Sequence, residues 1–243
     1  MQTPQRCNLF MSPTLSYHTS QVLQVKLRQD KMSQIHLAVL GHSFLASHHG
    51  LAADTMKYLE YHPRISSHFV CGLSGLTFDK VHRLQEKMDK DDYHPNSIFL
   101  LMGDNDIAFR SGNIKQSTAS FHRNRQRAVR TFEEQVGKGR VCSTVPFPRF
   151  QKDDQDLLYF DIDSPYNVMA GHYIRQLSRY RPSKWLPCVH QQHRVPFCRG
   201  RRLFPDMPPD ESLYLFKEDG IHPAIGSFDA LLRPCLDEWI SRL

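Results

Sequence analysis

A buried strand that ends in a glycine and a serine constrains this chain more than any other feature. The stretch Ile35–Leu40 (IHLAVL) is apolar at five of six positions, and Gly41 permits a tight turn directly after it. An apolar run of this length bounded by a glycine is typical of a strand in a parallel sheet covered on both faces. In open α/β sheets the ligand crevice lies just beyond the carboxyl ends of such strands. Ser43 is placed there, and from this stretch alone it is either a nucleophile or the N-cap of the next helix.

Further strands and helices alternate along the chain. We expect strands at His68–Cys71, Ile98–Met102, Val141–Val145 and Leu213–Phe216, and helices at about Ala46–Tyr61, Thr77–Met88, Ile114–Val136, Tyr166–Tyr180 and Ser227–Arg242. Pro234 must kink or split the last of these helices. Strands that alternate with helices at this spacing predict an α/β fold, a three-layer α/β/α sandwich with a central parallel five-stranded sheet.

The chain is expected to form one main domain preceded by an extension. Residues 1–33 have little apolar periodicity and predict a mobile N-terminal extension, whereas residues 34–243 carry the alternating pattern. Residues 181–211 are rich in proline, which suits neither a helix nor a central strand, and we expect an insertion over or beside the site. No apolar run approaches the roughly 20 residues needed to span a bilayer, so a membrane-spanning protein is not expected.

The net charge of +6 is unevenly distributed. The segments Arg110–Arg130 and Arg194–Arg202 are rich in arginine and contain no acidic residue. Such basic patches attract polyanions, but they are also found on ordinary solvated faces. Weak nucleic-acid binding through these two segments is therefore one of two interpretations of the charge.

The cysteines indicate a reducing compartment. Cys71 and Cys142 fall inside expected strands, where free cysteine behaves as a small hydrophobe. Zinc-ligand residue types at an unfamiliar spacing are found at Cys188, His190, His193 and Cys198. This cluster is either a structural zinc site or part of a polar loop. The sequence has no Cys-x-x-Cys pair and no recognisable secretory signal, which predicts a cytoplasmic location.

Polar groups follow the carboxyl ends of four expected strands. They lie in Gly41–Ser43, Gly72–Thr77, Gly103–Asp106 and Glu218–Pro223. A serine hydroxyl becomes a nucleophile when a base takes its proton, and the base needs a third group to orient it. His222 can be that base, and Asp219 on the same turn can accept its other ring N–H. The N–H groups of Ser43 and Gly75 and the side-chain amide of Asn105 can then stabilise the oxyanion.

In this order the four blocks resemble the SGNH hydrolase superfamily, the GDSL-type esterases and lipases. The resemblance covers roughly residues 35–242. It implies a flavodoxin-like fold and a cofactor-independent hydrolase that cleaves or transfers a small acyl ester, with no metal. By the same resemblance, Ser43 is the nucleophile, His222 the base and Asp219 its orienting group. Gly75 and Asn105 are implied as oxyanion donors.

The chain departs from the family pattern beside the nucleophile. His42 replaces the usual aspartate, and Leu76 replaces an acidic residue that is common after the oxyanion glycine. A Gly-His-Ser variant is also similar to esterase-like domains of some non-LTR retrotransposons. The alternative function is therefore a catalytically vestigial SGNH fold that binds nucleic acid. Neighbours in sequence diverge in direction, so we expect His42 to point away from Ser43.

Other polar residues near the strand ends have simpler interpretations. Ser74 is expected to be a turn residue, because its surroundings lack the strand-to-helix elbow of a nucleophilic serine. Asp104 and Asp106 precede or begin a helix, where carboxylates ordinarily act as caps or dipole partners rather than metal ligands. No pattern in the sequence identifies the ester or the oligomeric state.

Overall fold

A computed structural model describes residues 34–46, 50–108, 114–144, 146–147, 149–159, 161, 163–179 and 215–243. The chain divides into two units, Met1–Gln34 and Ile35–Leu243, and the second contains all of the helices and strands that follow. The expected extension at residues 1–33 and the expected insertion at 181–211 lie outside the described residues.

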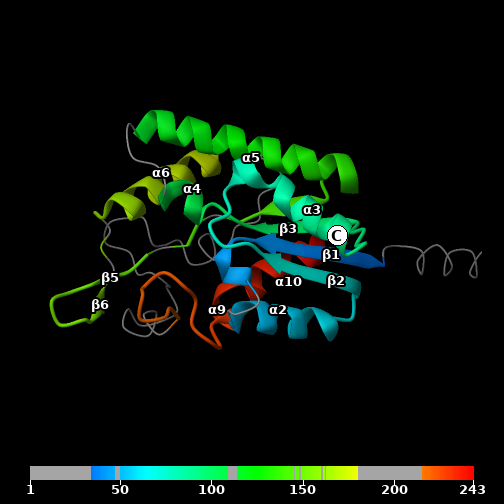
Figure 1. Cartoon of the computed structure of the whole chain (residues 1–243), viewed down its shortest axis with the longest axis horizontal. Coiled ribbons are helices and arrows are strands. Elements are labelled where there is room, and N and C mark those ends of the chain that lie inside the picture. The colour runs from blue at the N-terminus through cyan, green and yellow to red at the C-terminus, as the bar shows by residue number, and fades with distance from the viewer. Residues whose placement is uncertain are drawn as a thin grey trace, which may run out of the picture. The chain divides into compact units, whose positions relative to one another are not determined.

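A parallel sheet forms the centre of the second unit (Figure 1). Its strands are β1 (Ile35–Gly41), β2 (Ile65–Gly72), β3 (Ser97–Leu101) and β4 (Val141–Ser143), in the order β2-β1-β3-β4. Every pair of neighbouring strands is parallel. The chain passes from β1 to β2 on one side and then returns to place β3 on the other side of β1. A ligand crevice is expected at this reversal of strand order, beyond the carboxyl ends of β1 and β3.

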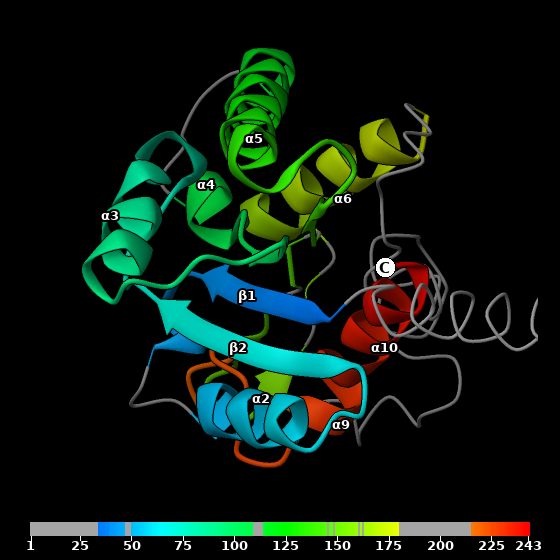
Figure 2. The same ribbon diagram turned by 90° about the vertical axis from the view of Figure 1, so that its right-hand side faces the viewer.

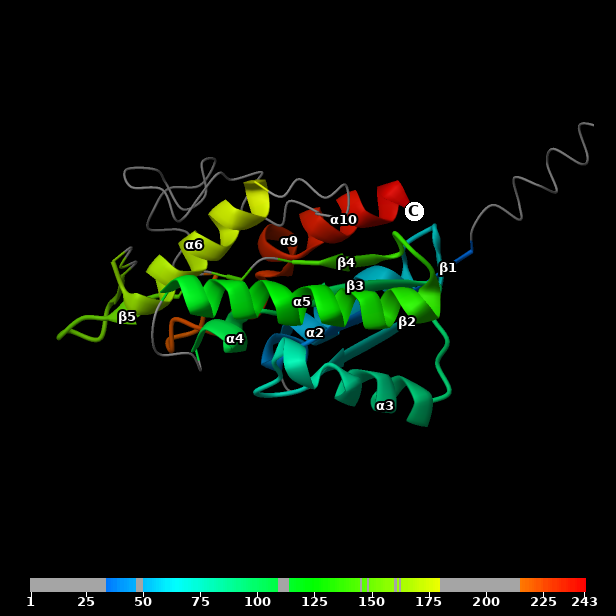
Figure 3. The ribbon, with the colours of Figure 1, turned by 90° about the horizontal axis from the view of Figure 1, so that it is seen from above.

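Helices cover both faces of the sheet (Figures 2 and 3). The described part of the chain contains the α-helices α2 (Gly50–Glu60), α3 (His82–Lys90), α4 (Asp104–Ala108), α5 (Ile114–Val136), α6 (Pro165–Arg179), α9 (Phe228–Leu231) and α10 (Arg233–Arg242). Helices α2, α9 and α10 pack on one face, and α3, α5 and α6 pack on the other. The α/β/α sandwich expected from the sequence is confirmed.

The alternation of side chains along the central strands produces two separate cores. Leu37 and Val39 of β1 pack with α2 and α10, whereas Ala38 and Leu40 face α3 and α5. Successive residues of a strand point to opposite faces of the sheet. All four side chains are fully buried, which explains why β1 is apolar without a break over these positions.

The strand count differs from the prediction. In the described part of the chain the parallel sheet has four strands rather than five. Phe216, at the end of the expected strand Leu213–Phe216, forms an isolated antiparallel bridge with Pro223. This bridge closes the turn between the two residues, so Phe216 does not extend the sheet. Leu213 and Tyr214 lie outside the described residues.

Two further differences concern short elements. The antiparallel pair β5 (Gln151–Lys152) and β6 (Leu158–Tyr159) is not predictable from the sequence, because strands of two residues have no visible periodicity. The last helix is split as expected, with Leu232 between α9 and α10. Pro234 lies in the first turn of α10, where its missing N–H removes no helical hydrogen bond. None of the described helices is long and apolar enough to cross a lipid bilayer.

Candidate active site

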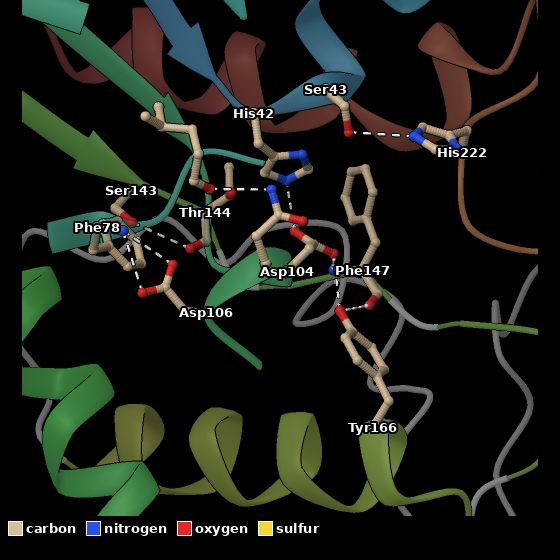
Figure 4. A network of polar contacts seen from close by, with 12 residues as sticks. His42, Ser43, Phe78, Asp104, Asp106, Ser143, Thr144, Phe147, Tyr166 and His222 are labelled. Atoms are coloured by element: carbon tan, nitrogen blue, oxygen red, sulfur yellow. Dashed lines mark hydrogen bonds and ion pairs between the residues drawn. The ribbon is translucent and has the colours of Figure 1, made fainter. Parts of the chain in front are cut away.

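A chain of hydrogen bonds connects Ser43, His222 and Asp219 at the carboxyl end of the sheet (Figure 4). The Oγ of Ser43 lies 3.2 Å from Nε2 of His222. On the other side of the ring, Nδ1 of His222 lies 2.6 Å from Oδ2 of Asp219. These are the three residues that the sequence indicates as nucleophile, base and orienting group. The arrangement allows a proton to pass from the hydroxyl to the imidazole.

The turn that carries His222 is held by its own backbone and by a neighbouring segment. Oδ1 of Asp219 accepts the backbone N–H groups of Ile221 and His222, both at 2.8 Å. Gly220 has φ +65°, and a Cβ at this position would lie 2.6 Å from the carbonyl oxygen of Phe150. The Phe150 N–H donates to the Gly220 carbonyl at 2.8 Å. A glycine is therefore needed at position 220 for both the backbone conformation and the close approach.

The carboxylate of Asp219 is electrostatically suited to orient an imidazole. Partial burial by itself raises the pKa of Asp219, but the backbone and ring N–H groups of His222 and the Ile221 N–H outweigh it and lower that pKa below its usual range. Asp219 is therefore ionised at neutral pH and accepts hydrogen bonds only.

Ser43 begins a short 3₁₀ helix, Ser43–Leu45, directly after β1. The N-cap of this helix is His42, which makes no side-chain cap hydrogen bond. The interpretation of Ser43 as a helix cap is therefore wrong, because its hydroxyl faces His222 instead. The turn is tightly packed: a Cβ at Gly72 would lie 2.3 Å from the carbonyl carbon of Leu45 and 2.5 Å from the carbonyl oxygen of His42.

The loop after β2 brings Gly75 into a turn beside this helix. The Leu73 N–H donates to the Gly41 carbonyl at 3.0 Å, and the Leu76 N–H donates to the Leu73 carbonyl at 3.2 Å. Gly75 lies between these anchored residues with φ +69°, and a Cβ there would meet no atom within 4 Å. Gly75 is therefore required by backbone conformation and not by lack of space.

The side chain of Asn105 reaches the same loop. Its Nδ2 donates to the carbonyl of Leu76 at 3.1 Å, one residue after Gly75. An amide group has two N–H donors, so this bond leaves one for another acceptor. The bond fixes the orientation of the amide with respect to the loop that contains Gly75.

Three consecutive residues at the start of α4 connect the loops of the site. Oδ2 of Asp104 lies 2.8 Å from Nε2 of His42, and Oδ1 of Asp104 accepts the Phe147 N–H at 2.9 Å. Asn105 binds the loop after β2, and Asp106 accepts the Phe78 N–H of the same loop at 3.1 and 3.2 Å. The first turn of α4 therefore ties the loops after β1, β2 and β4 to one another.

Asp104 and Asp106 lie in the first turn of α4, as expected of dipole partners, but the expectation that they cap this helix needs correction. Their carboxylates are buried and bind other elements, so neither acts as a cap of α4 through a described hydrogen bond. The structure describes no group of three or more His, Cys, Asp or Glu side chains able to hold a metal ion. Both carboxylates instead connect segments of the chain.

His42 is buried, with 1% of its surface exposed, and Figure 4 shows its side chain directed at Asp104 while that of Ser43 is directed at His222. The expectation that it points away from Ser43 is confirmed. The hydroxyl of Tyr166 lies 3.0 Å from Oδ1 of Asp104 and completes this buried network. The sequence does not reveal Tyr166 and Phe147 as members of the site, because no spacing relates them to the glycine-rich blocks.

The other candidates from the sequence are placed only in part. Ser74 is exposed on the turn after β2, as expected of a turn residue. In the basic segment Arg110–Arg130, Arg125 is buried, and burial lowers its pKa to about 9, so this arginine does not belong to a solvated basic face. Arg123, Arg127 and Arg130 are exposed on α5. Arg110, Arg194–Arg202 and the Cys188–Cys198 cluster lie outside the described residues.

Comparison with solved structures identifies the fold. An acetylxylan esterase from Geobacillus stearothermophilus matches with a TM-score of 0.53 and 16% identity, over 86% of this chain and 94% of that one. A GDSL-like lipase from Bacteroides thetaiotaomicron matches with a TM-score of 0.53 and 14% identity, over 90% and 97%. A putative acylhydrolase from Bacteroides fragilis matches with a TM-score of 0.55 and 15% identity, over 90% of this chain and 96% of that one.

Comparison at the level of sequence finds no match: no protein-family model and no curated protein matches the chain. At identities this low the structural likeness shows the fold, while the roles of individual residues depend on the geometry of this chain. The chain has the fold of the GDSL-like lipases and acetylxylan esterases.

Proposed function

We propose that the chain is an SGNH-type serine hydrolase that cleaves or transfers a carboxylic ester through Ser43, His222 and Asp219. The observation that carries this proposal is the continuous set of contacts from the Ser43 hydroxyl through the His222 ring to the Asp219 carboxylate, at 3.2 and 2.6 Å. A serine, an imidazole and a carboxylate in this order form the arrangement that activates a hydroxyl for acyl transfer.

The tautomer of His222 follows from its partners. Asp219 accepts the Nδ1–H, which leaves the lone pair of Nε2 facing the Ser43 hydroxyl. In the proposed reaction, Nε2 takes the hydroxyl proton while Oγ attacks the ester carbonyl carbon. The same proton then passes to the departing alcohol, and an acyl-serine remains. Water repeats the sequence, with His222 again as base, and releases the carboxylic acid.

The oxyanion of the tetrahedral intermediate needs donors that are already in place. We assign this role to the N–H groups of Ser43 and Gly75 and to the Nδ2 of Asn105. The hydrogen bond from Asn105 to the Leu76 carbonyl supports this assignment, because it holds the amide beside the loop of Gly75. The bond from Leu73 to the Gly41 carbonyl places that loop beside Ser43.

The ester itself is proposed at the level of a class. Structures with this fold include esterases described as acting on acetylxylan and acetyl-xylooligosaccharides. Short acyl esters, among them acetylated xylo-oligosaccharides, are therefore the first substrates to try on this chain.

A serine-directed fluorophosphonate probe tests the proposal without knowledge of the substrate. We expect the wild-type chain to be labelled at Ser43 and to hydrolyse p-nitrophenyl acetate, and we expect Ser43→Ala to lose both. Ser74→Ala is the matched control, because Ser74 is an exposed serine in a neighbouring loop and has no proposed role. Absence of labelling in the wild type, or equal hydrolysis by wild type and Ser43→Ala, would contradict the proposal.

A further inference from the structure

A buried imidazole beside the nucleophile has one ring nitrogen paired and the other without a partner among the described residues. Nε2 of His42 lies 2.8 Å from Oδ2 of Asp104, and the two side chains are only 1% and 3% exposed. Nδ1 of His42 is buried too, and no hydrogen-bond partner for it is found in the described part of the chain. The proposed ester hydrolysis assigns no step to either nitrogen.

The partners of Asp104 determine which nitrogen carries the proton. Its Oδ1 accepts the Phe147 N–H at 2.9 Å and lies 3.0 Å from the Tyr166 hydroxyl. Burial by itself raises the pKa of Asp104, but the contacts with His42, the charge of Arg149 and the Tyr166 hydroxyl lower it below its usual range. An ionised carboxylate only accepts hydrogen bonds, so Nε2 of His42 must be the donor.

The environment of Nδ1 leads to the same tautomer. A proton on Nδ1 would create a buried N–H without an acceptor, which carries the full desolvation cost of that group. A proton on Nε2, by contrast, has an acceptor in the Asp104 carboxylate. The contacts therefore favour the His42 tautomer with its proton on Nε2, the nitrogen that faces Asp104.

The bond between His42 and Asp104 spans two functional loops. His42 directly precedes Ser43, and its carbonyl accepts the Leu45 N–H at 3.1 Å, so it fixes the first turn of the nucleophile helix. Asp104 directly precedes Asn105, whose amide is directed at the loop of Gly75. A single hydrogen bond therefore joins the residue before the nucleophile to the residue before the oxyanion amide.

The ring of His42 also supports the base through Phe44. The rings of His42 and Phe44 meet edge to face with their centroids 4.2 Å apart. Phe44 contacts the ring of His222 in the same way at 5.5 Å, and it stacks on Phe147 at 5.6 Å. Loss of the imidazole would remove one wall of this aromatic packing.

We propose that His42 is a positioning residue of the active site, which aligns the Ser43 hydroxyl and the Asn105 amide through an Nε2–H donated to Asp104. This inference rests on the proposed function. It adds to the triad a second requirement for activity, the hydrogen bond between His42 and Asp104. His42 touches no reacting atom, so its effect is on the alignment of groups and hence on kcat more than on KM.

The first measurement determines the tautomer of His42 in the wild-type protein, and a variant is needed only to assign the signals of this ring. In ¹⁵N-labelled wild-type protein at pH 7.5, we expect the His42 ring to show a protonated Nε2 and an unprotonated Nδ1, assigned with His42→Gln. A proton on Nδ1, or rapid exchange between both tautomers, would overturn the inference whether or not the chain is an esterase.

The second measurement compares two substitutions of the same residue. His42→Phe keeps a ring of similar size but removes the donor to Asp104, and a misalignment of about 1 Å lowers kcat by about 100-fold. We expect this loss with KM changed by less than about threefold, because substrate binding is untouched. His42→Gln can place an amide N–H near the position of Nε2, and we expect it to recover at least about tenfold of that loss.

His36→Gln is the control, because His36 lies at the opposite end of the same strand and pairs with Ser67. Wild-type kcat in His42→Phe, or no recovery in His42→Gln, would overturn the inference. If His42→Phe does not fold, the tautomer of the His42 ring in the wild-type protein still decides. Failure of the fluorophosphonate probe to label wild type would instead remove the proposed function and, with it, the positioning role.

Discussion

Nε2 of His222 lies 3.2 Å from Oγ of Ser43, although the two residues are 179 positions apart in the chain. The contact joins the residues that follow the first strand to a turn that precedes α9. It depends on the Gly220 carbonyl, which accepts the Phe150 N–H at 2.8 Å and so holds the turn against the body of the unit.

Asp219→Asn should lower kcat by about 10⁴-fold, as expected when a neutral amide replaces the carboxylate behind a catalytic imidazole. The amide can present an N–H to Nδ1 of His222, which selects the tautomer with a protonated Nε2. That nitrogen then cannot take the Ser43 proton. The measurement is kcat with p-nitrophenyl acetate at pH 7.5.

Asp229→Asn is the control for Asp219→Asn, because Asp229 is an exposed carboxylate on α9 that pairs with Arg233 at 3.1 Å. Its loss removes a surface ion pair of small energetic value. A kcat for Asp219→Asn within a factor of two of the Asp229→Asn value would show that Asp219 does not orient the base.

Gly75→Ala should cost about 1–2 kcal/mol of unfolding free energy, because alanine is strained at positive φ. Gly137→Ala provides the match: its φ is +93°, and a Cβ there also meets no atom within 4 Å. We expect both variants to lose similar stability in urea unfolding, and only Gly75→Ala to lose ester hydrolysis as well. Equal ester hydrolysis by the two variants would contradict the role of the Gly75 N–H as an oxyanion donor.

Asp104→Ala should lower the unfolding free energy by about 2–6 kcal/mol, because two buried N–H donors, of His42 and Phe147, lose their acceptor at about 1–3 kcal/mol each. The Tyr166 hydroxyl keeps an acceptor in this variant, because the Phe147 carbonyl lies 3.0 Å from it. Urea unfolding followed by circular dichroism measures the loss. A change below about 1 kcal/mol would mean that water replaces the carboxylate.

The pH dependence of the same protein provides a second check. The pKa of Asp104 is lowered in the folded state, so the unfolded state binds the proton more tightly. The stabilisation from Asp104 is present above its unfolded pKa of about 3.9 and is lost as the pH falls through the lower folded pKa. Below about pH 4 we therefore expect stability to fall more steeply in the wild type than in Asp104→Ala.

The elements that the sequence predicts best are those with long uninterrupted patterns. The helix α5 has the predicted bounds, Ile114–Val136, because it is long and because Gly137 ends it with a positive φ. The pair β5 and β6 cannot be predicted in this way, since each strand has two residues. Of the expected strand Leu213–Phe216 the structure describes Leu215 and Phe216, and Phe216 pairs with Pro223 across a turn and not with the sheet.

The same distinction applies to the site. Asp219 and His222 are close in sequence, so one turn brings them together and their spacing is visible in the sequence. His42 and Asp104 are 62 residues apart, and their pairing depends on the parallel alignment of β1 and β3. No local pattern marks a contact of this kind, and for this reason the sequence shows His42 only as a departure from the family pattern.

The start of α4 limits how the length of this protein can vary. Asp104, Asn105 and Asp106 each bind a different group, and a helix turns by about 100° per residue. Deletion or insertion of one residue before Asp104 would rotate all three side chains away from their partners at once. Single substitutions remove one tie and leave the other two. Natural or engineered changes in chain length should therefore be accommodated after α4 and not between β3 and α4.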